Sequence, residues 1–298
     1  MGTVGIARAD QSHFAKGIAE AIEKAGGIPG ISDQICIKIN LCDSRTPETG
    51  AVTDPEFLAA FLMYLNENFK LENVYVAESD ATVARADLLM KWLGFDEILR
   101  KFNATWVNLS KAPTRPVDIQ GRHFKEVQVP ELLLDSYLIS MAKLKTHILT
   151  TISCALKNVY GCLPRPRKIV FHPFIDDVIV DANLAMRAKF SIVDGVVAHV
   201  GTQGPAYGIP VRGNLVVAGS DPVSVDATCS RLLGFAPFFV GHVRKAHYSG
   251  VGKMQTHVAG PSPRELRLNA EFSLFDKFAF SIAQRIRKAK SPGRTTSL

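Results

Sequence analysis

Short apolar segments alternate with amphipathic ones along this chain, and this alternation limits the fold more than any other feature. Strand-like segments are separated by segments whose apolar residues recur every three or four positions, as in helices. Such alternation favours a parallel sheet. The sequence therefore predicts an α/β fold with a largely parallel sheet flanked by helices, as one sheet or as two interleaved α/β lobes around a cleft. The expected strands are 3–7, 35–39, 73–77, 105–109, 136–141, 190–193 and 215–218, and the expected helices are 14–25, 54–65, 87–102 and 221–233.

Two of the expected helices carry a start signal. Residues 53–56, Thr-Asp-Pro-Glu, combine a cap, a first-turn proline and a capping-box glutamate, and Asp221 is the cap that precedes Pro222. The helix at 87–102 is expected to be interrupted near Gly94. The strand at 190–193 is expected to stop at Asp194-Gly195.

The positive charge of the chain is concentrated at its end. The net charge is +7, and residues 277–298 contain six basic residues and no acid, so +6 of the +7 belongs to this tail. The rest of the chain is near neutral, which makes nucleic-acid binding unlikely. We expect a single α/β region at 1–270 and a basic amphipathic helix and tail at 271–298. Such helices usually dock on their own domain, so contact with an anionic membrane is the minor interpretation.

Cysteine usage and hydropathy indicate a cytoplasmic protein. The five cysteines form no C-x-x-C pair, which argues for a reducing compartment and against a disulfide framework. No apolar run reaches the length of a membrane span, and the Met-Gly-Thr start lacks a signal-peptide core. The oligomeric state does not follow from the sequence.

A concentration of cations follows the apolar strand at 136–141. In open α/β sheets, ligands bind just past the carboxyl ends of strands. If the chain continues extended, the spacing of Lys143, Lys145 and His147 puts all three side chains on one face. The two lysines would then hold an anion, and His147 would serve it as an acid or base.

A short helix and a second basic loop come next. The helix carries Lys157 and Asn158, with Thr150, Thr151 or Ser153 as its candidate cap, and it ends before Gly161 and Pro164. The apolar surroundings should desolvate the Lys157 ammonium, lower its pKa and make it a better base or nucleophile. The alternative is that Lys157 only ties a carboxylate or backbone carbonyls together. The basic loop at 165–168 leads to His172, where positive charge favours the neutral imidazole that can ligate a metal.

Further candidates lie at other strand ends. Lys38 and Asn40 follow the strand at 35–39, and Arg45 lies in the next loop, so all three are expected to bind substrate beside Asn158. Asp194 could bind a metal or orient a histidine. An aspartate that only satisfies turn amides is the equally favoured alternative.

The motifs KLKTH, ALKNVYGCLP, IVDG, GPAYGIPV and GSDPVSVDA resemble the bacterial and archaeal domain-of-unknown-function family 362, with IKINL and GAVTDPE upstream. The resemblance covers about 35–252. Some members of that family carry ferredoxin-like cysteine clusters, which this chain lacks. An iron–sulfur-associated redox accessory is therefore one alternative that the resemblance implies.

The order His147, Lys157, His172 is distantly similar to the nickel-pincer region of the lactate racemase family, where a lysine attaches the cofactor and a histidine binds nickel. The cluster of Asp43, Arg45 and Pro47 resembles the substrate-binding loop of that family. This resemblance implies a divalent metal such as nickel, with His172 and Asp194 as the candidate ligands here, although the chain carries only part of the pattern.

These observations predict an enzyme that binds a small carboxylate or phosphate in a cleft rich in lysine and histidine. Its reaction would be isomerase-like, racemase-like or redox chemistry, with Lys157, His147 and His172 as catalytic residues. Two alternatives remain, the iron–sulfur accessory and a non-catalytic protein that binds through its basic tail.

Overall fold

The computed structural model describes residues 2–82, 84–201, 208–268 and 282. The expected basic helix and tail at 271–298 thus lie outside the described residues, apart from Ile282. No helix within the described ranges is long and apolar enough to cross a membrane.

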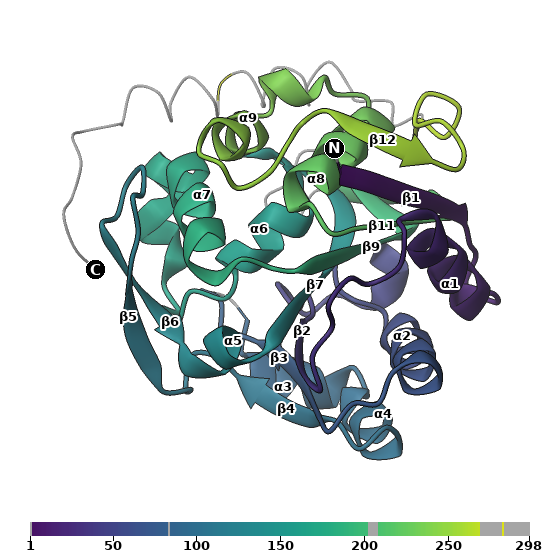
Figure 1. The fold of residues 1–298 in the computed structure, drawn as a ribbon, viewed down its shortest axis with the longest axis horizontal. Coiled ribbons are helices and arrows are strands. Elements are labelled where there is room, and N and C mark those ends of the chain that lie inside the picture. The colour runs from purple at the N-terminus through teal and green to yellow at the C-terminus, as the bar shows by residue number, and fades with distance from the viewer. Residues whose placement is uncertain (1, 83, 202–207, 269–281, 283–298) are drawn as a thin grey trace.

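Ten strands of the described chain form one sheet, and Figure 1 shows it crossing the middle of the molecule. Its main path runs β12-β1-β11-β9-β7-β2-β3-β4, with β10 paired to β9 and β8 paired to β7. The run from β9 to β4 is parallel, whereas β11 is antiparallel to both of its neighbours. The expected largely parallel sheet is confirmed. Its strands are β1 (Gly2–Arg8), β2 (Gln34–Lys38), β3 (Asn73–Glu78), β4 (Thr105–Asn108), β7 (Tyr137–His147), β8 (Thr151–Ser153), β9 (Phe190–Gly201), β10 (Gly208–Arg212), β11 (Leu215–Gly219) and β12 (Thr256–Ala259).

Helices cover both faces of the sheet, as strand alternation requires. In β2, Ile35 and Ile37 face one apolar cluster while Cys36 faces the other. The cluster of Ile35 is completed by α1 (Phe14–Lys24), α2 (Pro55–Asn68), α3 (Ala86–Trp92) and α4 (Phe95–Lys101). The cluster of Cys36 is completed by α5 (Glu131–Asp135), α6 (Ala155–Tyr160), α7 (Ile175–Met186), α8 (Pro222–Leu232) and α9 (Gly241–Tyr248).

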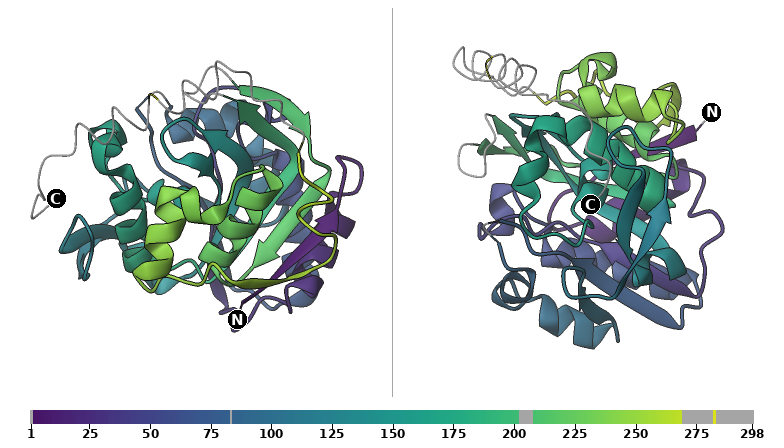
Figure 2. Two further views of the ribbon diagram at one scale, coloured as in Figure 1. Left: turned by 90° about the horizontal axis from the view of Figure 1, so that it is seen from above. Right: turned by 90° about the vertical axis from the view of Figure 1, so that its left-hand side faces the viewer.

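Three 3₁₀ turns and a small hairpin complete the described fold. The turns are η1 (Pro47–Thr49), η2 (Lys168–Phe174) and η3 (Pro237–Phe239), and the hairpin pairs β5 (Thr114–Asp118) with β6 (Glu126–Pro130). In the right-hand view of Figure 2, the green elements around α8 and α9 lie above the teal centre of the sheet, and the blue elements from α2 to β4 lie below it.

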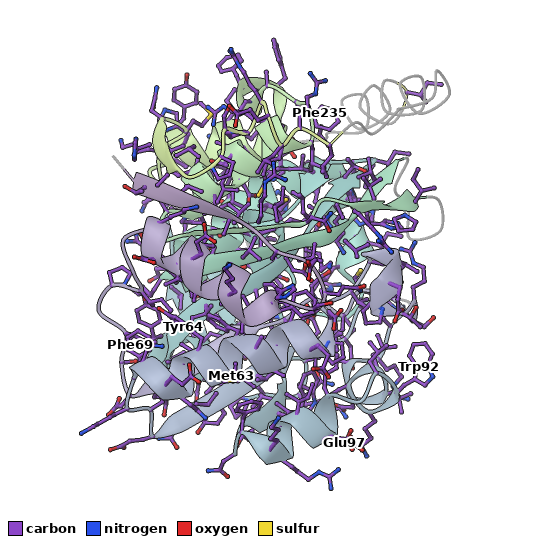
Figure 3. All side chains as sticks on the ribbon, turned by 90° about the vertical axis from the view of Figure 1, so that its right-hand side faces the viewer. Met63, Tyr64, Phe69, Trp92, Glu97 and Phe235 are labelled. Carbon is purple, nitrogen blue, oxygen red and sulfur yellow. The ribbon has the colours of Figure 1, made fainter. Side chains whose placement is uncertain are left out.

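Aspartate side chains cap the starts of α2 and α8. Asp54 accepts a hydrogen bond from the N–H of Glu56 at the start of α2, and Asp221 accepts from Val223 and Ser224 at the start of α8. The interruption at Gly94 separates α3 from α4, as expected. At the far end of α2, Tyr64 and Phe69 pack edge to face with ring centroids 6.4 Å apart, and Figure 3 shows them on the covering layer beside Met63.

Strands β7 and β9 are longer than expected. The prediction that a strand stops at Asp194 is wrong, because β9 continues to Gly201 and Asp194 lies inside it. The register between the two strands shifts: Lys143 is opposite Asp194, and Lys145 is opposite His199. Two residue steps of β7 therefore match five of β9, so β9 carries three extra residues here.

Candidate functional site

The ends of β2 and β3 lie side by side and are joined by a buried ion pair. Lys38 Nζ lies 2.7 Å from Glu78 Oε1, and it also donates to the carbonyl oxygen of Ile39 at 2.7 Å. The Glu78 carboxylate accepts from the N–H groups of Leu41 and Ser79, each at 2.8 Å. Because each charge is buried with its partner, this ion pair holds the two strand ends together.

Asn158 of α6 ties its helix to the sheet. Its Nδ2 lies within hydrogen-bonding distance of the carbonyl oxygens of Lys38 (2.9 Å) and Met141 (3.2 Å) and of Ser140 Oγ (3.1 Å). Its Oδ1 accepts from Lys38 Nζ at 3.2 Å and from Asn40 Nδ2 at 3.4 Å. The amide is therefore engaged on all sides, and it fixes the position of its neighbour along the helix, Lys157.

Lys145, at the end of β7, is held by an amide oxygen, a backbone carbonyl oxygen and a cysteine sulfur. Its ammonium donates to Asn40 Oδ1 at 2.7 Å, to the carbonyl oxygen of Ala51 at 2.8 Å and to Cys42 Sγ at 3.2 Å. No carboxylate of the described residues forms an ion pair with it. Lys145 is buried, so its ammonium lacks the carboxylate partner that a buried lysine usually has.

The start of α6 is fixed by a residue distant in sequence. Asp226 of α8 is fully buried, and its carboxylate accepts from the N–H of Ala155 at 2.8 Å and of Leu156 at 3.2 Å. The expectation of a local cap at Thr150, Thr151 or Ser153 is wrong, since the residue before the helix is Cys154 and it makes no side-chain cap. The Asp226 carboxylate also lies 3.6 Å from Nε2 of the buried His242.

The environment of Lys157 differs from that of the other lysines described so far. It is half-buried on α6, and among the described residues its ammonium has no hydrogen-bonding or ion-pair partner. Burial first, and then the positive charge of Lys145, lower the pKa of Lys157 to about 8. About a tenth of its side chains are then neutral at pH 7, which is far more than for an ordinary lysine.

Two imidazoles lie close enough to Lys157 to respond to its charge. Burial, followed by the charge of Lys157, lowers the pKa of His172 to about 4. Burial and the charges of Lys157, His172 and Lys145 hold the pKa of His147 well below its ordinary value. Nδ1 of His147 accepts a hydrogen bond from the N–H of Leu149 at 3.1 Å, so the neutral ring carries its proton on Nε2. Both rings are therefore neutral near pH 7.

A fourth lysine, Lys168, belongs to the same cluster and was not among the predicted site residues. Its ammonium donates to Ser79 Oγ at 2.8 Å and to the carbonyl oxygen of Asp80 at 2.9 Å. Burial lowers the pKa of Lys168 to about 8, although Glu78 opposes the shift. The only sequence signal for it is its place in the basic loop before His172. We name Lys38, Lys145, Lys157 and Lys168 the lysine cluster.

Arg45 is placed by internal contacts. Its guanidinium forms an ion pair with Asp43, with Nη2 2.6 Å from Oδ2, and its Nη1 lies 2.9 Å from Nε2 of His199. The other nitrogen of His199 donates to the carbonyl oxygen of Thr49 at 2.6 Å. His199, which the sequence did not single out, thus connects β9 to the loop of Arg45.

Lys143 lies apart from the lysine cluster, contrary to the expectation of one shared cleft. Its Nζ lies 2.6 Å from Asp194 Oδ2, and both side chains are 1% exposed. Phe14 and Asp54 line the same small space, on the face that α1 and α2 cover. Lys143 and Asp194 therefore neutralise each other. Among the described residues, no group of three histidine, cysteine or acidic side chains could hold a metal ion, at Asp194 or elsewhere.

The lysine cluster carries more positive charge than its surroundings neutralise. Two carboxylates, Glu78 and Asp80, act on its four lysines. A third, Asp43, also acts on Lys145, but it is paired with Arg45. Five cations against three carboxylates leave a surplus of two positive charges among these described residues. Lys38 is paired with Glu78, whereas Lys145 and Lys157 have no carboxylate partner. Such an arrangement can bind an anion between Lys145 and Lys157, beside the two neutral imidazoles.

Comparison with known proteins gives two matches. The family model described as domain of unknown function (DUF362) matches residues 35–231. The thylakoid-associated protein sll1697 of Synechocystis sp. is 24% identical over 260 residues, which cover 82% of this chain and 78% of that protein. No solved structure matches.

Proposed function

Since this chain belongs to the DUF362 family, whose name assigns no activity, we propose a function from the site itself: an enzyme that binds a small carboxylate or phosphate at Lys145 and Lys157. The observation that carries the proposal is the surplus of positive charge in the lysine cluster. Desolvated cations without acidic partners favour an anionic ligand, because the ligand supplies the missing countercharge.

In this proposal, each residue has a chemical role. Lys145 holds the anionic group, and Lys157 acts as base or nucleophile because its ammonium is easily deprotonated. His147 and His172 transfer protons, since both rings are neutral near pH 7. Lys38, Asn40 and Asn158 hold these groups in place through the contacts between β2 and α6. Arg45 and Lys143, which the sequence also offered as ligands of the anion, contribute less because carboxylates already pair with them.

A finer form of the proposal adds a divalent metal such as nickel. His172 supports it, because a neutral imidazole without a partner among the described residues can ligate a metal, and Lys157 could tether an attached cofactor. Asp194 does not support it, since Lys143 engages its carboxylate. Elemental analysis of the purified protein tests this form. Nickel retained by the wild type and by Lys125→Gln, but lost from His172→Gln, would support it.

Thermal unfolding in the presence of small anions tests the proposal. We expect phosphate or glycolate to raise the Tm more than chloride does at equal ionic strength, because only a ligand of the folded state shifts the equilibrium. The shift should disappear in Lys145→Met and Lys157→Met and persist in Lys125→Met, whose lysine is exposed elsewhere. Equal shifts in all four proteins would contradict the proposed site.

A further inference from the structure

Lys157 combines three features that no other lysine of the cluster shares. Its ammonium has no partner among the described residues, it keeps partial exposure, and it lies beside two neutral imidazoles. Lys38, by contrast, is fully buried against Glu78, and Lys145 and Lys168 each donate to named acceptors. Lys157 is therefore the most solvent-accessible amine of the lysine cluster.

We propose that Lys157 condenses with the carbonyl group of a small oxo acid to form an imine. This inference rests on the proposed anion site and specifies its substrate class, a molecule with a carbonyl group next to a carboxylate. Lys145 would hold the carboxylate, which brings the neighbouring carbonyl carbon to Lys157.

The composition of the site explains why an amine is needed. Proton transfer alone is within the reach of His147 and His172, since a neutral imidazole accepts a proton at one ring nitrogen and donates one from the other. A primary amine adds one reaction that an imidazole cannot perform, which is condensation with a carbonyl to an imine. When the imine nitrogen then takes up a proton from solvent, it withdraws electrons from the adjacent carbon. The depressed pKa of Lys157 supports this use, because only the neutral amine attacks.

The reaction balances without an oxidant or a metal. The amine lone pair forms the C–N bond, and the carbonyl π electrons move to oxygen. His172 passes one proton from nitrogen to that oxygen, which gives a carbinolamine. The hydroxyl group then takes the second N–H proton and leaves as water, so that a C=N bond remains. Both hydrogens of the amine and the carbonyl oxygen are thus released as one water molecule.

The helix holds Lys157 rigidly enough for this reaction. Asp226 fixes the first N–H groups of α6, and Asn158 fixes the following residue to the sheet. Asn183 Nδ2 also donates to the carbonyl oxygen of Leu156 at 2.9 Å. The backbone on both sides of Lys157 is therefore anchored, and only the lysine side chain has to move toward a carbonyl carbon.

Reductive trapping tests the inference on the full-length protein. The protein is incubated with glyoxylate and sodium cyanoborohydride at pH 7, and the modified residues are located by peptide mass spectrometry. We expect Lys157 to be modified at least about tenfold faster than the exposed Lys125, because its neutral fraction is larger. Lys157→Arg should abolish the site-specific adduct, whereas Lys125→Arg should leave it unchanged.

Glycolate, which lacks the carbonyl, separates the two proposals. If glycolate raises the Tm of the wild type but glyoxylate labels lysines only according to their exposure, the anion site stands and the imine is wrong. If glycolate has no effect and labelling follows exposure, both proposals fail. Rapid labelling of Lys157 that excess glycolate slows supports both.

Discussion

The carboxylate of Asp226 lies 2.8 Å from the backbone N–H of Ala155, across 71 residues of sequence. This contact, with its companion to Leu156, starts the helix that carries Lys157. A residue of one helix thus sets the position of the proposed reactive group on another. Asp226 is a positioning residue, since none of its contacts reaches the lysine itself.

Asp226→Asn should disturb Lys157 without touching it. The amide can accept at one atom only, so one N–H of α6 loses its partner, and we expect a loss of about 1–3 kcal/mol in the free energy of unfolding. We also expect the pH midpoint for acylation of the Lys157 amine to move from about 8 toward the ordinary pKa of lysine, because a displaced α6 would expose the ammonium to water. Asp221→Asn is the control, because Asp221 also accepts backbone N–H groups with both carboxylate oxygens, but at the start of α8 and at Lys253. If Asp226→Asn leaves this pH midpoint unchanged, Asp226 does not position Lys157.

The reactivity of Lys157 should follow pH with an unusual midpoint. Only the neutral amine reacts, so the rate of acylation should rise through about pH 8 and level off above it. Lys145→Met removes a neighbouring positive charge, which favours the ammonium and should raise the midpoint. Peptide mass spectrometry after brief labelling across pH 6–11 measures both values. A midpoint near 10 in the wild type would contradict the desolvated environment.

Lys143→Met should destabilise the protein while leaving anion binding intact. The substitution leaves Asp194 buried without its partner, which costs about 3–5 kcal/mol. Chemical denaturation measures the loss. The double variant Lys143→Met/Asp194→Leu removes both charges and should recover most of it. If the folded double variant loses the glycolate-induced Tm shift, Lys143 takes part in anion binding and its placement outside the site is wrong.

Acid should weaken the fold through its buried histidines. Burial is the main cause that lowers the pKa of His172 and of His199 to about 4. Between pH 6.5 and 4 the unfolded chain binds protons that the folded chain does not, so stability is lost as the pH falls through this window. His172→Gln should reduce this loss, whereas His257→Gln, at an exposed position, should not. Parallel pH dependence in all three proteins would contradict the assignment.

Gly50→Ala should displace the loop of Arg45. Gly50 has φ +70°, and an added Cβ would lie 2.7 Å from the backbone of Ala198 in β9. Gly27→Ala is the control, because Gly27 has φ +84° but open space around it. Both variants suffer the backbone strain of about 1 kcal/mol, and only Gly50→Ala adds a clash. Thermal unfolding measures the decrease in Tm of each variant. Equal decreases for Gly50→Ala and Gly27→Ala would show that the close approach of Gly50 to β9 does not matter for stability.

Local sequence patterns were sufficient for much of the fold. The helix start at 53–56 and the cap at Asp221 depend on residues within three positions, and both were predicted correctly. Lys38, Asn40 and Lys145 could be brought together because each lies at or just past the carboxyl end of a parallel strand, and such strands end at one edge of the sheet.

The rest depends on contacts that no local pattern encodes. Lys143 and Lys145 are two residues apart, yet one pairs with Asp194 and the other reaches Asn40, because the register of β9 changes between them. Lys168 and the capping role of Asp226 likewise arise only when distant segments pack. The sequence therefore predicted several of the residues that meet in the lysine cluster but not which of its cations remain unpaired.

Because β9 carries three extra residues, the number of residues between Asp194 and His199 determines whether both can keep their contacts. Because side chains alternate between the faces of a strand, deleting one residue between Asp194 and His199 would turn His199 to the opposite face while the pair with Lys143 stayed in place. Deleting two would restore its direction but draw it out of reach of Arg45. In family members that share this site, we therefore expect substitutions within 195–198 to be tolerated more readily than insertions or deletions.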